Sequence, residues 1–114
     1  MIPATAVLLS DRASEALLEL ERSSTPAALA IARRARAFKL VLLVDCLHGE
    51  VVRKGAIPKS LKATYGLENL YVEDLPAFWR MLYTVAKHDG RRVVVIVEIV
   101  SHKEHSRWFP GRRK

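Results

Sequence analysis

The 114-residue sequence lacks the features that mark secreted and membrane proteins. It contains a single cysteine, Cys46, so neither an internal disulfide nor a zinc site built from several thiolates can form. No stretch approaches the roughly 20 consecutive apolar residues of a membrane span. The apolar run before Ser10 has no basic segment in front of it, unlike a signal peptide. We therefore expect a soluble cytoplasmic protein.

Acidic residues are scarce relative to basic ones. The chain has 12 Asp and Glu against 19 Lys and Arg, which leaves a formal net charge of +7 at pH 7. Half of the residues are apolar, which excludes a disordered chain and suffices for one modest core, so we expect a single domain over residues 1–114. So basic a small domain favours a polyanionic partner, namely RNA, DNA, an anionic membrane or an acidic protein.

The beginning of the sequence predicts a strand and then a helix. Ala4–Leu9 is a short apolar run of the kind that forms strands. Ser10 or Asp11 then caps a helix that ends near Ser23. Apolar residues spaced three and four apart give this helix one buried stripe. They are Ala13, Ala16, Leu17 and Leu20.

A second, longer helix follows after a very short link. Ser24 or Thr25 is its expected cap, and Pro26 takes the first helical position, where the missing N–H costs nothing. We expect this helix to run to about Leu47 and to stop at Gly49. Because the link is so short, the two helices should form an antiparallel hairpin.

The second half of the chain predicts a sheet. An irregular segment, 48–66, contains one helical turn near Lys59–Thr64, and three runs rich in aromatic and β-branched residues follow it. Asp89-Gly90 between the last two runs predicts a type I′ hairpin, because both central residues of that turn need a positive φ. The expected strands are Asn69–Leu75, Phe78–Lys87 and Arg92–Val100.

A two-residue hairpin loop fixes how the last two strands pair and completes the expected fold. The fold class is α+β: a strand, a two-helix antiparallel hairpin, then a three-stranded antiparallel meander, with the helices on one face of the small sheet. The expected pairs across the hairpin are Lys87 with Arg92, Leu82 with Val97 and Arg80 with Ile99.

Two classes of function find no support in the residues. A helix-turn-helix protein needs a third, recognition helix, whereas this helix pair leads into a sheet. His102 and His105 are only three residues apart, and no helical His-Glu-x-x-His pattern occurs. We therefore expect no metal site and no cofactor.

Basic residues gather in three places. Those of the second helix are spaced by three and share one face, which is either a solvated surface or a phosphate contact. A second group precedes the sheet, and a third forms the tail. The three groups are Arg33, Arg36 and Lys39; Lys54, Lys59 and Lys62; and His102 to Lys114, which ends in Gly111, Arg112, Arg113 and Lys114.

Three blocks of residues stand out in the last part of the chain. They are Asn69-Leu70-Tyr71-Val72 with Leu75-Pro76, Trp79-Arg80-Met81-Leu82-Tyr83-Thr84-Val85, and Val93 to Ile99 followed by Ser101 to Phe109. Together they resemble the RelE/ParE superfamily of type II toxins, in which the blocks correspond to the second strand, to an aromatic-Arg-x-x-Tyr third strand, and to the final strand with its tail. The strand and helix pair that come first agree in order with the same family.

The resemblance implies cleavage of mRNA without metal, in which a 2′-hydroxyl attacks the adjacent phosphodiester. Arg80 matches the arginine of the third strand and would grip the phosphate with its planar fork of donors. Its structural alternative is an ion pair with Glu98 or Asp74. Lys103 falls where many members carry a second arginine, so it would be a further catalytic contact to phosphate. The two histidines of the tail, His102 and His105, would exchange the protons.

The chain also departs from the family pattern. On the second strand, where some members carry catalytic lysines, it has Tyr71 and Glu73, and Glu73 would either act as a base or repel phosphate. Phe109 stands where other members end in tyrosine, so it would stack on a base but transfer no proton. The implied RNA contacts are Arg33, Arg36, Lys39, Lys59, Lys62, Trp108 and Phe109.

The resemblance implies partners as well. They are mRNA, the ribosome and a RelB-like antitoxin, with no membrane among them. The main rival is a ParE-like toxin, which shares the fold, inhibits gyrase and cuts nothing. A third alternative is an inactive RNA-binding relative.

Overall fold

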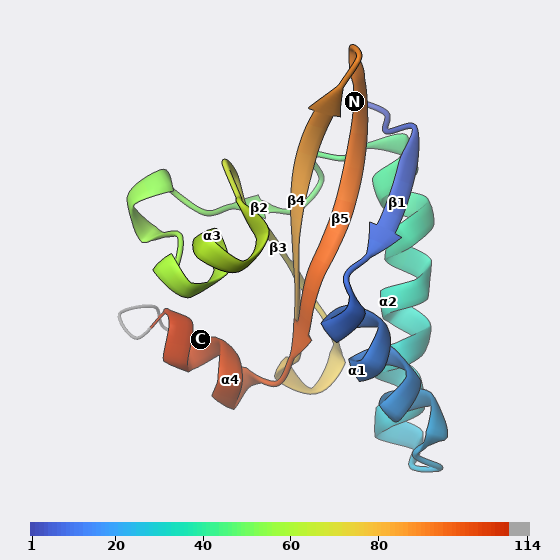
Figure 1. The fold of residues 1–114 in the computed structure, drawn as a ribbon. Coiled ribbons are helices and arrows are strands. Elements are labelled where there is room, and N and C mark those ends of the chain that lie inside the picture. Colours follow the sequence, from blue (N-terminus) through green and yellow to red (C-terminus); the bar gives the residue numbers. More distant parts are fainter. Residues whose placement is uncertain (110–114) are drawn as a thin grey trace.

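The computed structural model describes residues 1–109 as a five-stranded mixed sheet with helices on both faces (Figure 1). The strand order is β1-β5-β4-β3-β2, with β1 parallel to β5 and the other neighbours antiparallel. The α+β class and the expected order of elements are confirmed. The strands are β1 (Ala6–Leu9), β2 (Glu50–Val51), β3 (Tyr71–Asp74), β4 (Arg80–His88) and β5 (Arg91–Val100).

The sheet is larger than the predicted meander. That meander is present as β3, β4 and β5, but β1 extends it at one edge and β2 at the other. The sequence predicts β1 as a strand without placing it in the sheet, and it does not predict β2, which has two residues. The predicted tail residues Gly111, Arg112, Arg113 and Lys114 lie outside the described residues.

The two helices α1 (Asp11–Arg22) and α2 (Pro26–Val44) form the predicted hairpin and cover one face of the sheet (Figure 1). Both caps are as predicted: Ser10 Oγ accepts a hydrogen bond from the Ala13 N–H at 3.1 Å, and Thr25 Oγ1 accepts one from Ala28 at 3.2 Å. Their apolar stripes fill the first core. Its members include Leu17, Leu20, Ile31, Phe38 and Leu42 from the helices and Met81, Tyr83, Ile96 and Ile99 from the sheet.

The predicted end of α2 is wrong by about one turn. The helix stops at Val44, because the backbone of Asp45 is extended there and its carboxylate accepts hydrogen bonds from the N–H groups of Ile2 and Leu47, both at 3.3 Å. Gly49 is not the helix stop. It lies against β3 and β4 instead.

The opposite face of the sheet is also covered, which corrects the prediction of helices on one face. A 3-10 turn η1 (Lys54–Ala56), α3 (Lys59–Tyr65) and α4 (His102–Trp108) lie on that side (Figure 1). The strands present apolar residues to both faces, so each face needs cover. The second core consists of Val52, Ile57, Leu61, Leu67, Leu70, Val72, Leu82, Val97, Val100 and Phe109.

The β4–β5 hairpin has the predicted turn, and its register shifts at a bulge. Asp89 and Gly90 have φ values of 52° and 76°, as a type I′ turn requires, and Lys87 pairs with Arg92. Beyond the turn Val97 is an extra residue in β5, so each later pair moves by one position. Leu82 therefore faces Glu98 rather than Val97, and Arg80 faces Val100 rather than Ile99.

Candidate functional site

Arg80 begins β4 at the rim of the sheet, and its side chain is held within the protein. It is 9% exposed. Its Nε lies 3.1 Å from Asp74 Oδ1, and Nη1 donates a hydrogen bond to the Trp79 carbonyl at 3.1 Å. Asp74 is its cross-strand partner on β3. Of the two ion pairs anticipated for Arg80, the structure forms the one with Asp74.

The turn before Arg80 presents an aromatic side chain that the sequence analysis does not single out. In η2 (Pro76–Phe78), Ala77 and Phe78 have φ values of 58° and 63°, which is strained backbone for residues other than glycine. Phe78 is 69% exposed, and its ring centroid lies 6.2 Å from that of His102. Pro76, which marks the turn, is the sequence signal for it.

Helix α4 separates the predicted catalytic residues of the tail. His102 and Lys103 are exposed on its first turn. His105 is buried with its ring 4.7 Å from that of Phe109, and Phe109 belongs to the second core. Trp108 is partly buried against the same core. In this arrangement Phe109 stacks on a histidine rather than on a base, and His105 is shielded from substrate, because one side of the helix must cover the sheet.

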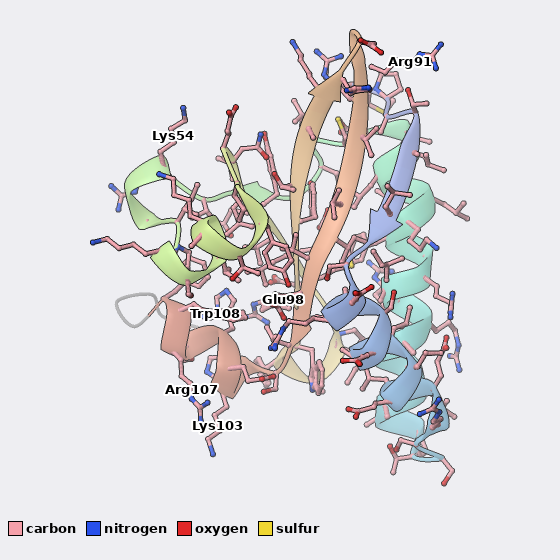
Figure 2. The ribbon with its side chains drawn as sticks, viewed as in Figure 1. Lys54, Arg91, Glu98, Lys103, Arg107 and Trp108 are labelled. Carbon is pink, nitrogen blue, oxygen red and sulfur yellow. The ribbon has the colours of Figure 1, made fainter. Side chains whose placement is uncertain are left out.

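The basic groups lie on two sides of the molecule rather than along one groove. Arg36 of α2 is tied to Glu21 of α1, with Nη2 2.9 Å from Oε1, and this pairing lowers the pKa of Glu21. Arg33 is exposed and Lys39 is half-buried on the same helix. The other cations extend from the opposite side of the sheet, as Figure 2 shows for Lys54, Lys103 and Arg107. Lys59 and Lys62 on α3 belong to that side and are exposed.

A histidine and a buried glutamate meet on the α2 side, where the sequence predicts no histidine role. His48 Nδ1 lies 2.7 Å from Glu73 Oε2. Glu73 is 5% exposed, and burial raises the pKa of its carboxyl group while His48 opposes that shift. The centroid of the His48 ring lies 6.1 Å from that of Phe38, and the Arg34 guanidinium carbon lies over the Phe38 ring, 5.0 Å from its centroid.

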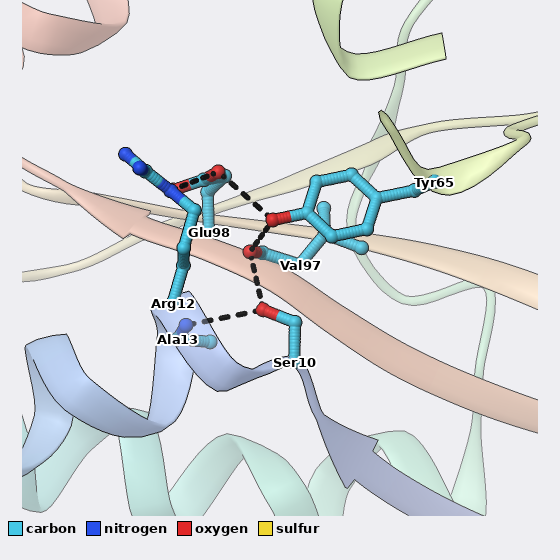
Figure 3. A network of polar contacts seen from close by, with 6 residues as sticks. All are labelled: Ser10, Arg12, Ala13, Tyr65, Val97 and Glu98. Atoms are coloured by element: carbon cyan, nitrogen blue, oxygen red, sulfur yellow. Dashed lines mark hydrogen bonds and ion pairs between the residues drawn. The ribbon is translucent and has the colours of Figure 1, made fainter. Parts of the chain in front are cut away.

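A second buried glutamate, Glu98, lies in a polar network on the opposite face (Figure 3). The Arg12 Nε is 2.9 Å from its Oε2, and the Tyr65 hydroxyl donates to the same oxygen at 3.2 Å. Burial raises the pKa of Glu98, and Arg12 opposes that shift. Ser10 Oγ donates a hydrogen bond at 2.7 Å to the carbonyl of Val97, the bulge residue. The network joins α1, α3 and β5.

A cleft of about 420 Å³ opens beside Glu98. Trp79 and Arg12 contribute to its walls, but several carboxylates surround them, so the cleft repels phosphate. These carboxylates belong to Glu15, Glu19, Glu98 and Glu104.

Neither a metal centre nor a membrane span is found in the part of the chain that the structure describes. Within residues 1–109 no three His, Cys, Asp or Glu side chains are grouped so that they could hold a metal ion. In the same range no helix is long and apolar enough to cross a membrane.

The geometry defines a class of protein: a small α+β domain whose twisted sheet carries a helix hairpin on one face and a C-terminal helix on the other. The particular match is to a structure of a mutant E. coli toxin RelE in the free state, with a TM-score of 0.52 and 15% sequence identity over 94% of this chain and 92% of that chain. No protein-family profile matches the sequence, and no curated protein matches it either. At this identity the likeness is one of fold, and the chain has a RelE-like fold.

Proposed function

We propose that this protein is the toxin of a type II toxin-antitoxin system, and that it cleaves mRNA in the ribosomal A site without a metal ion. The observation that carries the proposal is the structural match to the toxin RelE over nearly the full length of both chains. The net charge of +7 supports a polyanionic substrate. In the proposed reaction a 2′-hydroxyl attacks the neighbouring phosphate and leaves a 2′,3′-cyclic phosphate and a 5′-hydroxyl.

The rim around Arg80 is the proposed RNA contact. The side chain of Asp74, the ion-pair partner of Arg80, is 83% exposed. A phosphate can therefore replace Asp74 as that partner without leaving a buried charge unpaired. The exposed ring of Phe78 offers the stacking surface that the buried Phe109 does not. His102 and Lys103 lie beside this turn on α4 and would contact the same strand of RNA.

The proposed partner is a RelB-like antitoxin. A toxin with this many exposed cations needs an acidic protein that binds and inhibits it, because lysine and arginine side chains bind the RNA backbone regardless of its sequence. The antitoxin would bind over the exposed lysines of α3 and the first turn of α4 and neutralise their charge.

Primer extension on mRNA from translating extracts tests the proposal. The protein should produce codon-spaced breaks, and Arg80→Ala should reduce cleavage by about 10- to 100-fold, as expected for loss of a charge-assisted contact to an RNA phosphate. Arg91→Ala, which removes an exposed arginine at the hairpin tip, should cleave as the wild type does. An Arg80→Ala protein with full activity would overturn the assignment of Arg80.

A ParE-like inhibitor of gyrase without nuclease activity is the second candidate. It is favoured by the ion pair between Arg80 and Asp74 and by the burial of His105 and Phe109, which leave the family's catalytic set unassembled. Lost gyrase supercoiling without RNA breaks would identify this function. RNA binding without either effect would identify an inactive relative.

A further inference from the structure

Among the four histidines of the chain, His48 has the environment of a proton-transfer group. Its Nδ1 is 2.7 Å from a carboxylate that is 5% exposed, whereas its own side chain is 48% exposed. His88 also lies near a carboxylate, Asp89, but both side chains are almost fully exposed at the hairpin tip, where solvent screens the pair. His102 is exposed on α4 and His105 is buried against Phe109.

The backbone that carries His48 is held in place on both sides. The Gly49 N–H donates to the buried Tyr83 hydroxyl at 2.9 Å, and a Cβ at Gly49 would lie 2.9 Å from both that hydroxyl and the Val72 carbonyl. On the other side, the Asp45 carboxylate accepts a hydrogen bond from Leu47. The anchored backbone and the hydrogen bond to Glu73 restrict the orientation of the imidazole, which is the preorganisation that proton transfer requires.

The surroundings of the pair suit an anionic substrate. Nδ1 faces Glu73 and the His48 side chain is half exposed, so Nε2 is the nitrogen that we assign to the substrate. Arg34 supplies a positive charge on the same side, and that charge acts on Glu73. The pairing of β2 with β3 ends at Val72, so Glu73 lies where β3 is the edge of the sheet. A nucleic-acid strand can therefore approach this position from outside the sheet.

We propose that His48 is the general base of the reaction, that Glu73 positions it, and that Arg34 supplies positive charge beside it. This inference rests on the proposed function of RNA cleavage. It places the scissile phosphate beside Arg34 on the α2 side, so the rim around Arg80, which lies toward the opposite face of the sheet, contacts the RNA at another phosphate. His48 Nε2 takes the proton of a ribose 2′-hydroxyl, the 2′-oxygen forms a bond to the adjacent phosphorus, and the bond from phosphorus to the 5′-oxygen breaks. The leaving 5′-oxygen takes a proton from water, and His48 returns its proton to the solvent, so no net proton is gained or lost.

The substitution His48→Asn tests the base. The asparagine amide can still donate to Glu73 from the position of Nδ1, so the fold is preserved while the titratable nitrogen is lost. We expect cleavage to fall on the order of 10²-fold or more, with unchanged RNA binding and thermal unfolding. His88→Asn, which alters a screened pair at the hairpin tip, should leave cleavage unchanged. Full cleavage by His48→Asn, with the wild type also active, would overturn the inference and leave the proposed function standing.

The substitution Glu73→Gln tests the positioning role through the pH profile. Removal of the negative charge disfavours the imidazolium form of His48, so the midpoint of the rising limb of the rate should move to lower pH, and the maximum rate should fall. A purely structural role for Glu73 would lower the rate without moving the midpoint, and that result would overturn the positioning role. A wild-type protein that cuts neither free nor translated RNA would overturn the proposed function, and His48 as base with it.

Discussion

Two glutamates are buried in this sheet on opposite faces, and they are held in different ways. Glu98 is bound by the permanent charge of Arg12 and by the Tyr65 hydroxyl, at the point where α1, α3 and β5 meet. Glu73 is bound by His48, a titratable side chain that is half exposed and that comes from a loop. Burial raises the pKa of both carboxyl groups. Their burial is therefore alike, and their partners differ.

The difference separates a structural polar network from a chemical one. Around Glu98 every partner also ties two elements together, and the adjoining cleft is acidic, which suits neither phosphate nor RNA. Around Glu73 the partner is a half-exposed imidazole, and Arg34 adds positive charge. A buried carboxylate thus indicates a reactive site only when the group it orients can itself reach the substrate.

The largest expected effect is on stability, in the second core beneath α4. Phe109→Ala should lower the free energy of unfolding by about 3–5 kcal/mol, because its ring is buried in the second core. Phe78→Ala, at a ring that is 69% exposed, should change it by less than about 0.5 kcal/mol. Urea unfolding measures both variants. A small loss for Phe109→Ala would mean that α4 leaves the sheet easily, and its ring would then be free to stack on RNA.

A medium effect is expected where Gly49 supports His48. Gly49→Ala should cost about 1–3 kcal/mol, since the added methyl overlaps the Tyr83 hydroxyl and the Val72 carbonyl. It should also reduce cleavage on the order of 10²-fold through displacement of the base. Gly55→Ala is the matched control, because nothing lies within 4 Å of its added methyl, and it should be neutral in both measurements. A Gly49→Ala protein that is destabilised yet fully active would mean that the position of His48 does not matter for catalysis.

Each of the two polar networks contains one tyrosine hydroxyl that can be removed by a single substitution to phenylalanine. Tyr65→Phe removes the donor to Glu98, and Tyr83→Phe removes the acceptor of the Gly49 N–H. Each should cost about 1 kcal/mol in thermal or urea unfolding. Only Tyr83→Phe should also slow RNA cleavage, because only that hydroxyl fixes the loop of His48. Equal effects of the two variants on cleavage would remove the distinction between the networks.

Much of the fold is predictable because its signals are local. The caps at Ser10 and Thr25, the proline after Thr25 and the Asp89-Gly90 turn each act within a few residues. The bulge at Val97 is not predictable in this way, since it depends on how Ser10 and Tyr65 reach its carbonyl from distant elements. One extra residue is enough to move Arg80 from Ile99 to Val100.

The candidate site is less predictable than the fold for the same reason. The ion pair of Arg80 with Asp74 is one of two alternatives that the sequence allows, and the strand register decides between them. His48 and Glu73 are 25 residues apart, and no spacing rule joins them. The exposure of Phe78 and the burial of Phe109 depend on α4, which the sequence presents only as a tail. Residue types thus indicate the chemistry, but the faces on which they lie come from tertiary structure.

The smallest expected effect is the dependence of stability on pH, and it compares the two glutamates directly. Both have a pKa raised in the folded state, so above the ordinary glutamate range the native state binds more protons than the unfolded one. The contribution of each of these two glutamates to the free energy of unfolding therefore falls as the pH rises through that window. Glu98→Gln and Glu73→Gln should each flatten this slope, measured as urea midpoints between about pH 5 and about pH 8.

The causes of the two shifts are matched, although the partners differ. For each carboxyl group burial raises the pKa, and a hydrogen-bonded partner opposes that rise: His48 for Glu73, and Arg12 with Tyr65 for Glu98. The two substitutions should therefore change the slope in the same direction. An unchanged slope in one variant would mean that burial does not raise the pKa of that carboxyl group, and the two glutamates would then differ in their burial as well as in their partners.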